Sequence, residues 1–471
     1  GNLGLLLAQD ALSFYAFFAL MSFASYGLVL HARKPESYSA ARLYIGFVVA
    51  GELALFAGLA LAVAQAGSFL LVDLRGAQMS DLAAGLMVAG FGVKLGLMPL
   101  HFWLPPAHGA APVPASAVLS GAMIKAGLFG ILSAVPLGGL AYADHGTLVM
   151  AAGMVTIFAA LLLGVQERSA KTVLGYSSVS QMGIIALGLG AGLMVPEAWP
   201  ALLPVLVFLA AHHALAKGAL FLGTGVYGAM AGPRARLFVM LALALPAAAL
   251  AGLVATSGGL GKEALKSALE AGSDAWLPWL IVALTLSGVA TTLLMARFGY
   301  TLWKQAPAAP EAVRVQPDSL VVPFLGLVAL SASLPMAWPL IAPAEGLAVL
   351  DAKPADPLPI MAGIVIALAA IIRAYALRVG IEAFIGQITA PFIALHGRIE
   401  ASGRRGGRAL RRVARRIPQT LTQRAETLRL GQTAIAALIL VVIAVGMVEM
   451  RMADAEITAP LPEMPVDVLD P

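Results

Sequence analysis

The chain has 471 residues, of which 60% are hydrophobic and only 12% are charged. Soluble domains carry roughly 25% charged residues, so this composition excludes an ordinary soluble globular protein. The formal net charge of +5 includes ten arginines between Arg398 and Arg429. Because most of the excess positive charge is this local cluster, we do not expect the chain to bind nucleic acid.

The sequence has no cysteine and only seven histidines. The absence of cysteine excludes disulfides, cysteinyl iron–sulfur clusters and thiolate zinc sites. Nothing in the sequence indicates a pair of histidines on facing helices that could ligate a haem. We therefore expect no cofactor, no metal site and no catalytic redox group in this chain. Any redox energy would come from a partner, and whether the chain forms part of an enzyme stays open.

Apolar runs long enough to cross about 30 Å of hydrocarbon recur along the chain. They predict an all-α, polytopic transmembrane bundle of about twelve spans in a bacterial inner membrane. The expected spans are Leu3–Leu30, Leu43–Ala66, Leu82–Leu104, Ser116–Leu137, Thr147–Val165, Val179–Met194, Ala201–Tyr227, Leu237–Leu269, Leu277–Phe298, Val321–Ile341, Leu358–Leu377 and Thr433–Met450.

The eighth run, Leu237–Leu269, is too long for one ordinary span and is interrupted by a Ser-Gly-Gly sequence at residues 257–259. We expect one discontinuous helix here, because all the basic loops then lie on one side of the membrane, as the positive-inside rule requires. Two separate spans would place the later basic loops on the opposite side.

The arginine-rich segment 398–432 is interleaved with apolar residues and precedes the last span, in residues 433–471. One interpretation is a solvated face whose arginines, Arg404–Arg429, bind anionic lipids. The alternative is a surface helix that contacts a neighbouring subunit before the final span anchors the chain. The charge pattern does not decide between them.

Charged side chains inside spans cost at least about 2.5–3.5 kcal/mol each at the centre of the membrane. A single lysine could extend its ammonium group to the interface, but Lys125 is flanked by apolar residues from Ala115 to Leu137. A whole series of such residues favours a relay that moves protons. The candidates are Glu52, Lys94, Lys125, His212, His213, Lys217, Lys262 and Glu263, with His101 and His108 as possible access residues.

Relay chemistry requires groups whose protonation changes when a counter-charge moves. Glu52 lies in the span next to that of Lys94 and is its expected acid. His213 and Lys217 are four residues apart and therefore share one helix face. An imidazole titrates near neutral pH and could pass protons between lysines.

Helix-breaking residues accompany two of the lysines. Gly92 and Pro99 flank Lys94, and Gly258 and Gly259 precede Lys262. Unwound backbone at membrane depth requires protein or water around it, and broken helices at matching places indicate inverted repeats. We expect a first repeat at residues 1–137 broken at 82–110, a second at 138–300 broken at 237–270, and two further helices in 301–397.

Four motifs resemble one known family. They are KLGLMPLHFWLPPAHGAAPVPASAVLSGAMIKAG from Lys94, GYSSVSQMG from Gly175, HALAKGALFLGTG from His213 and GGLGKEAL from Gly258. In order and spacing they are similar to the antiporter-like subunits of respiratory complex I, of Mrp-type sodium/proton antiporters and of membrane-bound hydrogenases. The resemblance covers about residues 3–300.

This resemblance implies two inverted five-helix repeats and a central axis of lysines, histidines and carboxylates. Lys94 and Lys262 correspond to the lysines of the two broken helices. Lys125 and Lys217 correspond to the connecting relay, with His213 beside the latter. The partners implied are other membrane subunits of a hetero-oligomeric complex.

The sequence departs from the family pattern in three places. Ala19 stands where the family has a glutamate, so Glu52 could supply that acid from the next helix. Pro106 follows Trp103-Leu104-Pro105 where aspartate is common. The family core begins about four helices earlier, which suggests truncation or a divergent branch.

Several functions fit this pattern. The first is proton translocation within a quinone-reducing or hydrogenase-like complex. Within the same fold, cation/proton antiport of the Mrp type and proton-coupled support of inorganic-carbon uptake are the alternatives. A different class is an assembly or anchoring subunit with a vestigial relay. The four buried lysines argue against that class, because buried charges are costly to keep.

Overall fold

The computed structural model describes residues 1–139, 141–230, 232–270, 275–305, 317–377, 380–387, 389–390 and 394. Within these residues the protein is an all-helical bundle, and the β pairing present is an isolated bridge between Asp10 and Leu70. Ten helical stretches are long and apolar enough to cross a membrane. The protein is therefore a multi-pass membrane protein, as predicted, although the count of twelve spans is not confirmed.

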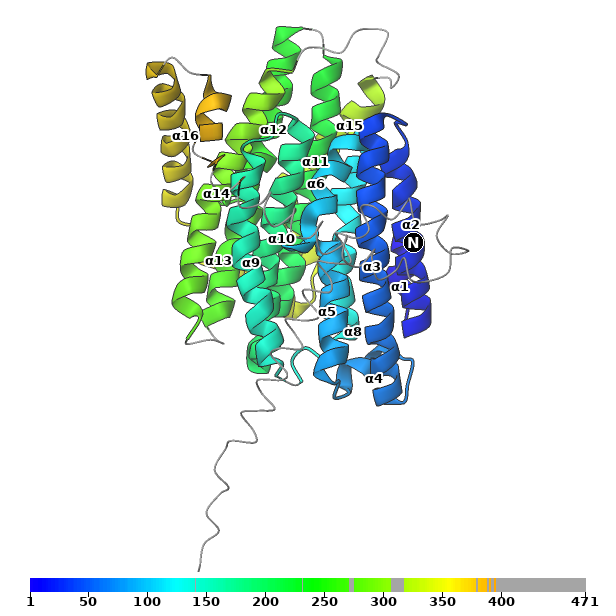
Figure 1. Cartoon of the computed structure of the whole chain (residues 1–471). Helices are drawn as coiled ribbons and strands as arrows, with labels where there is room; N and C mark the ends of the chain where they lie inside the picture. The colour runs from blue at the N-terminus through cyan, green and yellow to red at the C-terminus, as the bar shows by residue number, and fades with distance from the viewer. Residues whose placement is uncertain are drawn as a thin grey trace, which may run out of the picture.

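The helices follow one another with short connections (Figure 1). Their bounds are α1 (Asn2–Leu7), α2 (Ala11–Leu30), α3 (Pro35–Ala66), α4 (Leu71–Gly76), α5 (Asp81–Leu95), η1 (Leu100–Trp103), α6 (Leu104–Ala110), α7 (Val113–Val118), η2 (Leu119–Met123), α8 (Lys125–Ala134), α9 (Ala143–Gly164), α10 (Ala170–Met194), η3 (Pro196–Ala198), α11 (Trp199–Ala229), α12 (Pro233–Ala251), α13 (Ser257–Glu270), α14 (Leu277–Trp303), α15 (Pro317–Ile341), η5 (Ala344–Asp351) and α16 (Leu358–Ala376).

The first predicted span is shorter than expected. The Leu3–Leu30 run is divided into α1 and α2, because Asp10 caps α2 by accepting hydrogen bonds from the backbone N–H groups of Leu12 and Ser13 at 3.0 and 2.8 Å. An aspartate in this position satisfies backbone donors that the first helical turn leaves free. Hydropathy alone did not reveal this helix start.

The first broken helix is present where it was expected. α5 ends at Leu95, Gly96 takes the left-handed conformation at φ 73°, and Pro99 precedes η1 and then α6. Figure 1 shows α5 in the lower half of the bundle and α6 in the upper half. Gly92 itself lies within the last turn of α5.

The second broken helix is also present, but its unwound part lies earlier than predicted. α12 ends at Ala251, and residues 252–256 connect it to α13. Gly258 and Gly259 belong to the first turn of α13. They allow close packing there, since a Cβ on Gly258 would overlap the carbonyl group of Ala249.

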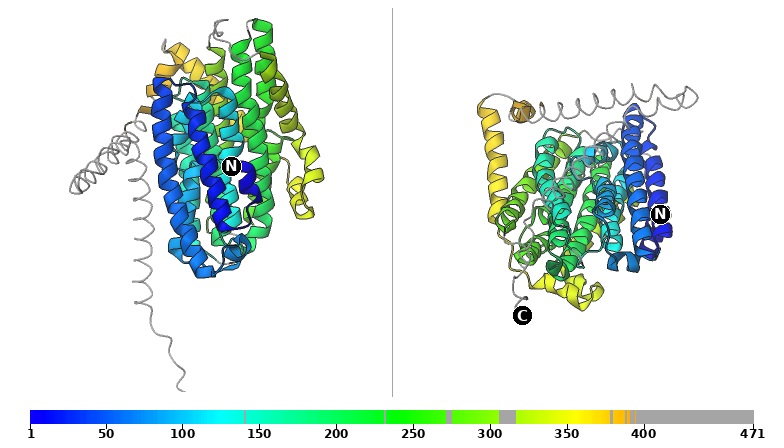
Figure 2. Two further views of the ribbon diagram at one scale, coloured as in Figure 1. Left: turned by 90° about the vertical axis from the view of Figure 1, so that its right-hand side faces the viewer. Right: turned by 60° about the horizontal axis from the view of Figure 1, so that its bottom comes forward.

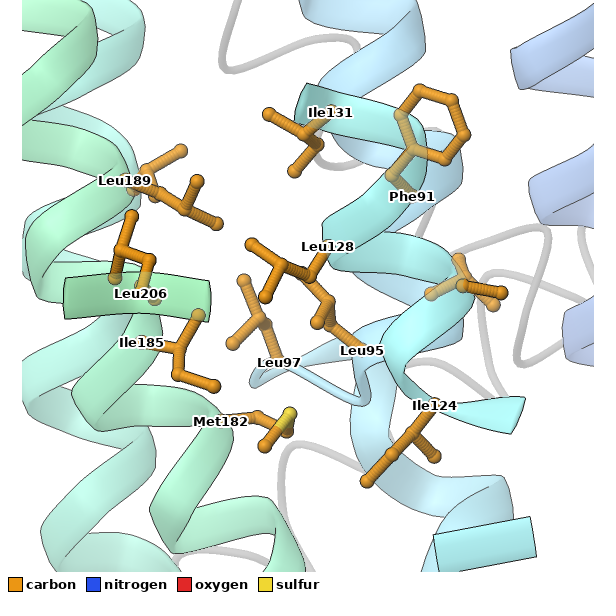
Figure 3. Packing of buried hydrophobic residues seen from close by; sticks show 14 of the residues in the cluster. Phe91, Leu95, Leu97, Ile124, Leu128, Ile131, Met182, Ile185, Leu189 and Leu206 are labelled. Atoms are coloured by element: carbon orange, nitrogen blue, oxygen red, sulfur yellow. The ribbon is translucent and has the colours of Figure 1, made fainter. Parts of the chain in front are cut away.

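α10 forms the centre of the molecule, with 94% of its most apolar window buried. Figure 3 shows Met182, Ile185 and Leu189 from α10 facing Leu97 and Leu128. Figure 2 shows the N-terminal helices at one side of the bundle and α16 at the other. The buried apolar residues form two clusters, and the polar residues described below pack against members of both, such as Phe18 in one and Phe221 in the other.

Some predictions fall outside the described residues. These are the arginine-rich segment 398–432, with its expected lipid contacts at Arg404–Arg429, and the last span, Thr433–Met450.

Candidate functional site

The first polar cluster lies where α2, α3 and α5 meet. Lys94 is 2% exposed, and its Nζ donates a hydrogen bond to Ser22 Oγ at 2.5 Å. The same ammonium group lies 4.9 Å from the centre of the Phe18 ring. Glu52 is also buried, contacts Ser22, and interacts electrostatically with Lys94. The expected pairing of Glu52 with Lys94 is thus geometrically possible through one shared hydroxyl group.

The second cluster lies at a distortion between α7 and α8. Residues Leu119–Met123 form a π-helical turn, η2, immediately before Lys125. Lys125 Nζ donates to the Ser120 carbonyl oxygen and lies 2.6 Å from His213 Nδ1. Single π turns inside α-helices are frequent at functional sites because they release a backbone carbonyl. Here the carbonyl of Ser120 within that turn holds the lysine.

Lys217 and His108 extend this second cluster. Lys217 is fully buried, and its Nζ donates to the Leu174 carbonyl oxygen at 2.9 Å. The His108 ring stacks on Phe221 with centroids 4.6 Å apart. Both ring nitrogens of His108 are buried without a hydrogen-bond partner among the described residues. His108 also interacts electrostatically with Lys217 and Lys125.

The third cluster lies at the second helix break. Lys262 Nζ donates to the carbonyl oxygen of Ala251, the last residue of α12, at 3.0 Å. A cation is favoured there because the carbonyl end of a helix carries partial negative charge. His212 Nδ1 lies 2.8 Å from Ser257 Oγ. His212 and Lys262 interact electrostatically, so α11 and α13 are joined at this point.

Two further predicted residues, Glu263 and His101, lie outside the main contacts of the three clusters. Glu263 forms an ion pair with Lys266 at 2.7 Å. The His101 ring lies 4.5 Å from the Phe102 ring and 6.4 Å from that of Tyr176, measured between centroids. His101 is therefore placed between an aromatic side chain of the first half, Phe102, and one of the second half, Tyr176.

The three clusters form a row across the bundle. His213 and His212 are neighbours on α11, which connects the second cluster to the third. Between the first and second clusters, the Tyr44 hydroxyl group donates to the Ser22 carbonyl oxygen at 2.8 Å and lies 3.6 Å from Met123 Sδ. Sequence reasoning missed Ser22 and Tyr44, because a serine or tyrosine in an apolar helix gives no distinctive signal.

A cavity of about 560 Å³ lies at the end of the bundle that carries the basic loops. Its lining includes Arg168, Lys171 and Lys304. Lys171 Nζ donates to the Ala111 carbonyl oxygen at the end of α6, and Lys171 interacts electrostatically with His108. Among the described residues, no group of three His, Cys, Asp or Glu side chains could hold a metal ion.

Residues 8–289, more than half of the chain, match the family model described as NADH:quinone oxidoreductase/Mrp antiporter, TM. The chain belongs to this family. The relay candidates from Glu52 to Glu263 all lie inside the region that matches the antiporter family model.

Among curated relatives, Hydrogenase-4 component B of Escherichia coli (strain K12) is 37% identical over 234 residues, covering 47% of this chain and 35% of that protein. A Na(+)/H(+) antiporter subunit from Alkalihalophilus pseudofirmus is 26% identical over 350 residues, covering 70% of this chain and 69% of that protein. The chain thus spans only part of the length of these antiporter-family relatives.

A solved structure with the same fold is the Mrp complex from Dietzia sp. DQ12-45-1b. It matches with a TM-score of 0.66 and 24% sequence identity, and the match covers 99% of this chain and 52% of that chain. At this identity the match shows the antiporter-family fold alone.

Proposed function

We propose that this chain is a proton-translocating, antiporter-like subunit of a multisubunit energy-converting complex in a bacterial inner membrane. Other membrane subunits of that complex are its partners. The proposal is supported by family membership and by the row of buried lysines and histidines between the two broken helices. We further assign residues 1–137 and 138–300 to two repeats, with one broken helix in each.

The observation that carries this proposal is the contact between Lys125 Nζ and His213 Nδ1 at 2.6 Å. If both groups were cationic, their repulsion would be roughly 6 kcal/mol at an effective dielectric constant of 20. The pair therefore holds one proton between two bases. Either nitrogen can be the donor, since neutral imidazole and neutral amine both have a lone pair. Such a pair can pass a proton along the row.

The surroundings suggest a direction of entry. The cavity on the basic side leads through Lys171 to His108, and from there to Lys217 and Lys125. His213 and His212 continue the path to Lys262. Glu52, in the first repeat, controls the protonation state of Lys94. In this mechanism the redox or ion-gradient energy comes from partner subunits, and this chain moves the protons.

The test is Lys125→Met in the assembled complex, with proton uptake measured in inside-out membrane vesicles. Removing the shared proton site should lower the rate by at least tenfold, while Arg75→Met at the exposed end of α4 should leave it unchanged. Lys94→Ala and Lys262→Ala should behave like Lys125→Met. Parental pumping by all three assembled variants would refute the relay and support an anchoring role.

The competing cation/proton antiport function receives support from the match to a Na(+)/H(+) antiporter component over 70% of the chain. Purifying the complex through a tag on this chain would distinguish these candidate functions by the proteins that copurify. Copurification of a quinone-reducing or hydrogenase arm supports the proposal. Mrp-type small subunits and sodium-dependent uptake support antiport instead, and a zinc-containing soluble partner supports a role in inorganic-carbon uptake.

A further inference from the structure

The segment between η5 and α16 lies against α13 and α14 at a level near the middle of the membrane. Ala355 packs on Gly259, since a Cβ added to Gly259 would lie 3.1 Å from the Ala355 Cβ. Pro359 packs on Gly288, where an added Cβ would lie 2.9 Å from the Pro359 Cβ. Gly288 is eleven residues from the start of α14, and Gly259 is eleven residues from the end of α13. At 1.5 Å per residue, both positions are about 16 Å from those helix ends.

This depth is close to the midplane of a hydrocarbon core about 30 Å thick. Figure 1 agrees, since the lower end of α16 lies near mid-height in the bundle. Asp356, between the two anchored residues, is nevertheless exposed. A carboxylate at this depth faces a polar cavity or a protein partner, because contact with lipid is costly.

A small cavity connects Asp356 to the third cluster. It has a volume of about 20 Å³, which is sufficient for about one water molecule. Its lining includes Lys262, Glu263, Lys266 and Asp356. A single water could therefore contact the relay lysine and the carboxylate of Asp356.

Glu263 interacts electrostatically with Lys262, but its carboxylate is already held in an ion pair with Lys266 at 2.7 Å and is therefore less free to take up a proton. Asp356 forms no ion pair within 4 Å among the described residues, and its Oδ1 accepts a hydrogen bond from the Leu358 backbone N–H at 2.9 Å. The carboxylate is thus held in place at the start of α16 and keeps an oxygen available.

We propose that Asp356 is the acid that accepts the proton released by Lys262 and passes it to water on the side opposite the basic loops. This inference rests on the proposed function. In the transfer step, an N–H bond of the Lys262 ammonium breaks, an O–H bond forms on Asp356, and one water carries the proton between them. Both groups become neutral, and Asp356 then releases its proton to the outer water.

The experiment replaces Asp356 in the assembled complex and measures proton uptake in inside-out vesicles. Asn and Ser both cap helices well, so Asp356→Asn and Asp356→Ser keep the start of α16 without a titratable group. We expect a loss of at least tenfold in both, with normal assembly. Asp356→Glu should restore uptake with a changed pH profile, and Asp351→Asn is the control at a nearby exposed acid.

The outcomes separate this inference from the proposed function. If Lys262→Met abolishes uptake while Asp356→Asn or Asp356→Ser pumps at the parental rate, the role of Asp356 is wrong and the relay stands. If Lys262→Met itself pumps normally, the proposed function fails first. Equal loss in the Glu, Asn and Ser variants, with no change in pH profile, would show a structural role and also overturn the inference.

Discussion

Glu52 and Lys94 form a buried acid–base pair in which both partners reach the hydroxyl group of Ser22. Removing one partner of such a pair leaves an uncompensated charge, which costs about 3–5 kcal/mol. Ala19 lies one helical turn before Ser22 on α2, so an acid at position 19 would reach the same lysine. We propose that Glu52 on α3 takes the place of the glutamate that the family resemblance implies at position 19 of α2.

This exchange leads to a prediction at the level of single residues. Glu52→Gln should lower proton uptake at least tenfold, because Lys94 loses its counter-charge. Adding Ala19→Glu to that variant should restore much of the rate. The measurement is dye-monitored uptake in vesicles with equal amounts of assembled complex, and Glu36→Gln at the exposed start of α3 is the matched control. A double variant as inactive as Glu52→Gln would contradict the equivalence of the two positions.

The two helix breaks are the elements that make room for the lysines. In the second break, Gly252 has φ 99° and its added Cβ would lie 3.2 Å from Lys262 Cδ. Ala255 in the same connection has φ 61°, a conformation that is unfavourable for a residue with a side chain. The connection is held by its surroundings and leaves the Ala251 carbonyl group free to bind Lys262.

The prediction for this element concerns stability. Gly252→Ala should reduce the free energy of unfolding by about 1–2 kcal/mol, because alanine is strained at positive φ. The expected signal is a fall of a few degrees in the melting temperature of the purified, detergent-solubilised complex. Gly27→Ala is the control, since that glycine lies inside α2 with open space around it and should tolerate a methyl group. Equal melting temperatures for both variants would contradict the strain argument.

At the scale of the whole molecule, the broken helix formed by α12 and α13 sets the orientation of everything after it. If the two helices form one span, the loops before α3, before α12 and after α14 lie on the same side. The positive charges of Lys34, Arg234 and Lys304 then all face the cytoplasm.

The sequence has no cysteine, which makes this topology directly testable. Single variants Lys34→Cys, Arg234→Cys and Lys304→Cys should react with a membrane-impermeant maleimide only in inside-out vesicles. Gln78→Cys, in the loop between α4 and α5, should react only in intact spheroplasts. Labelling of Lys304→Cys from the outer side would show that α12 and α13 cross the membrane separately.

Hydropathy and charge position alone were sufficient to predict the helical membrane bundle, the two breaks and the lysines near them. They were sufficient because a charge in an apolar span, or a cluster of glycines in a long apolar run, can be recognised from a few neighbouring residues of the sequence. Contacts between distant helices have no such local signal. Only the tertiary structure pairs Lys125 with His213 and places Asp356 and Lys262 in the lining of one cavity, because both depend on how separate segments pack. The ion pair of Glu263 with Lys266, by contrast, is a local contact within α13.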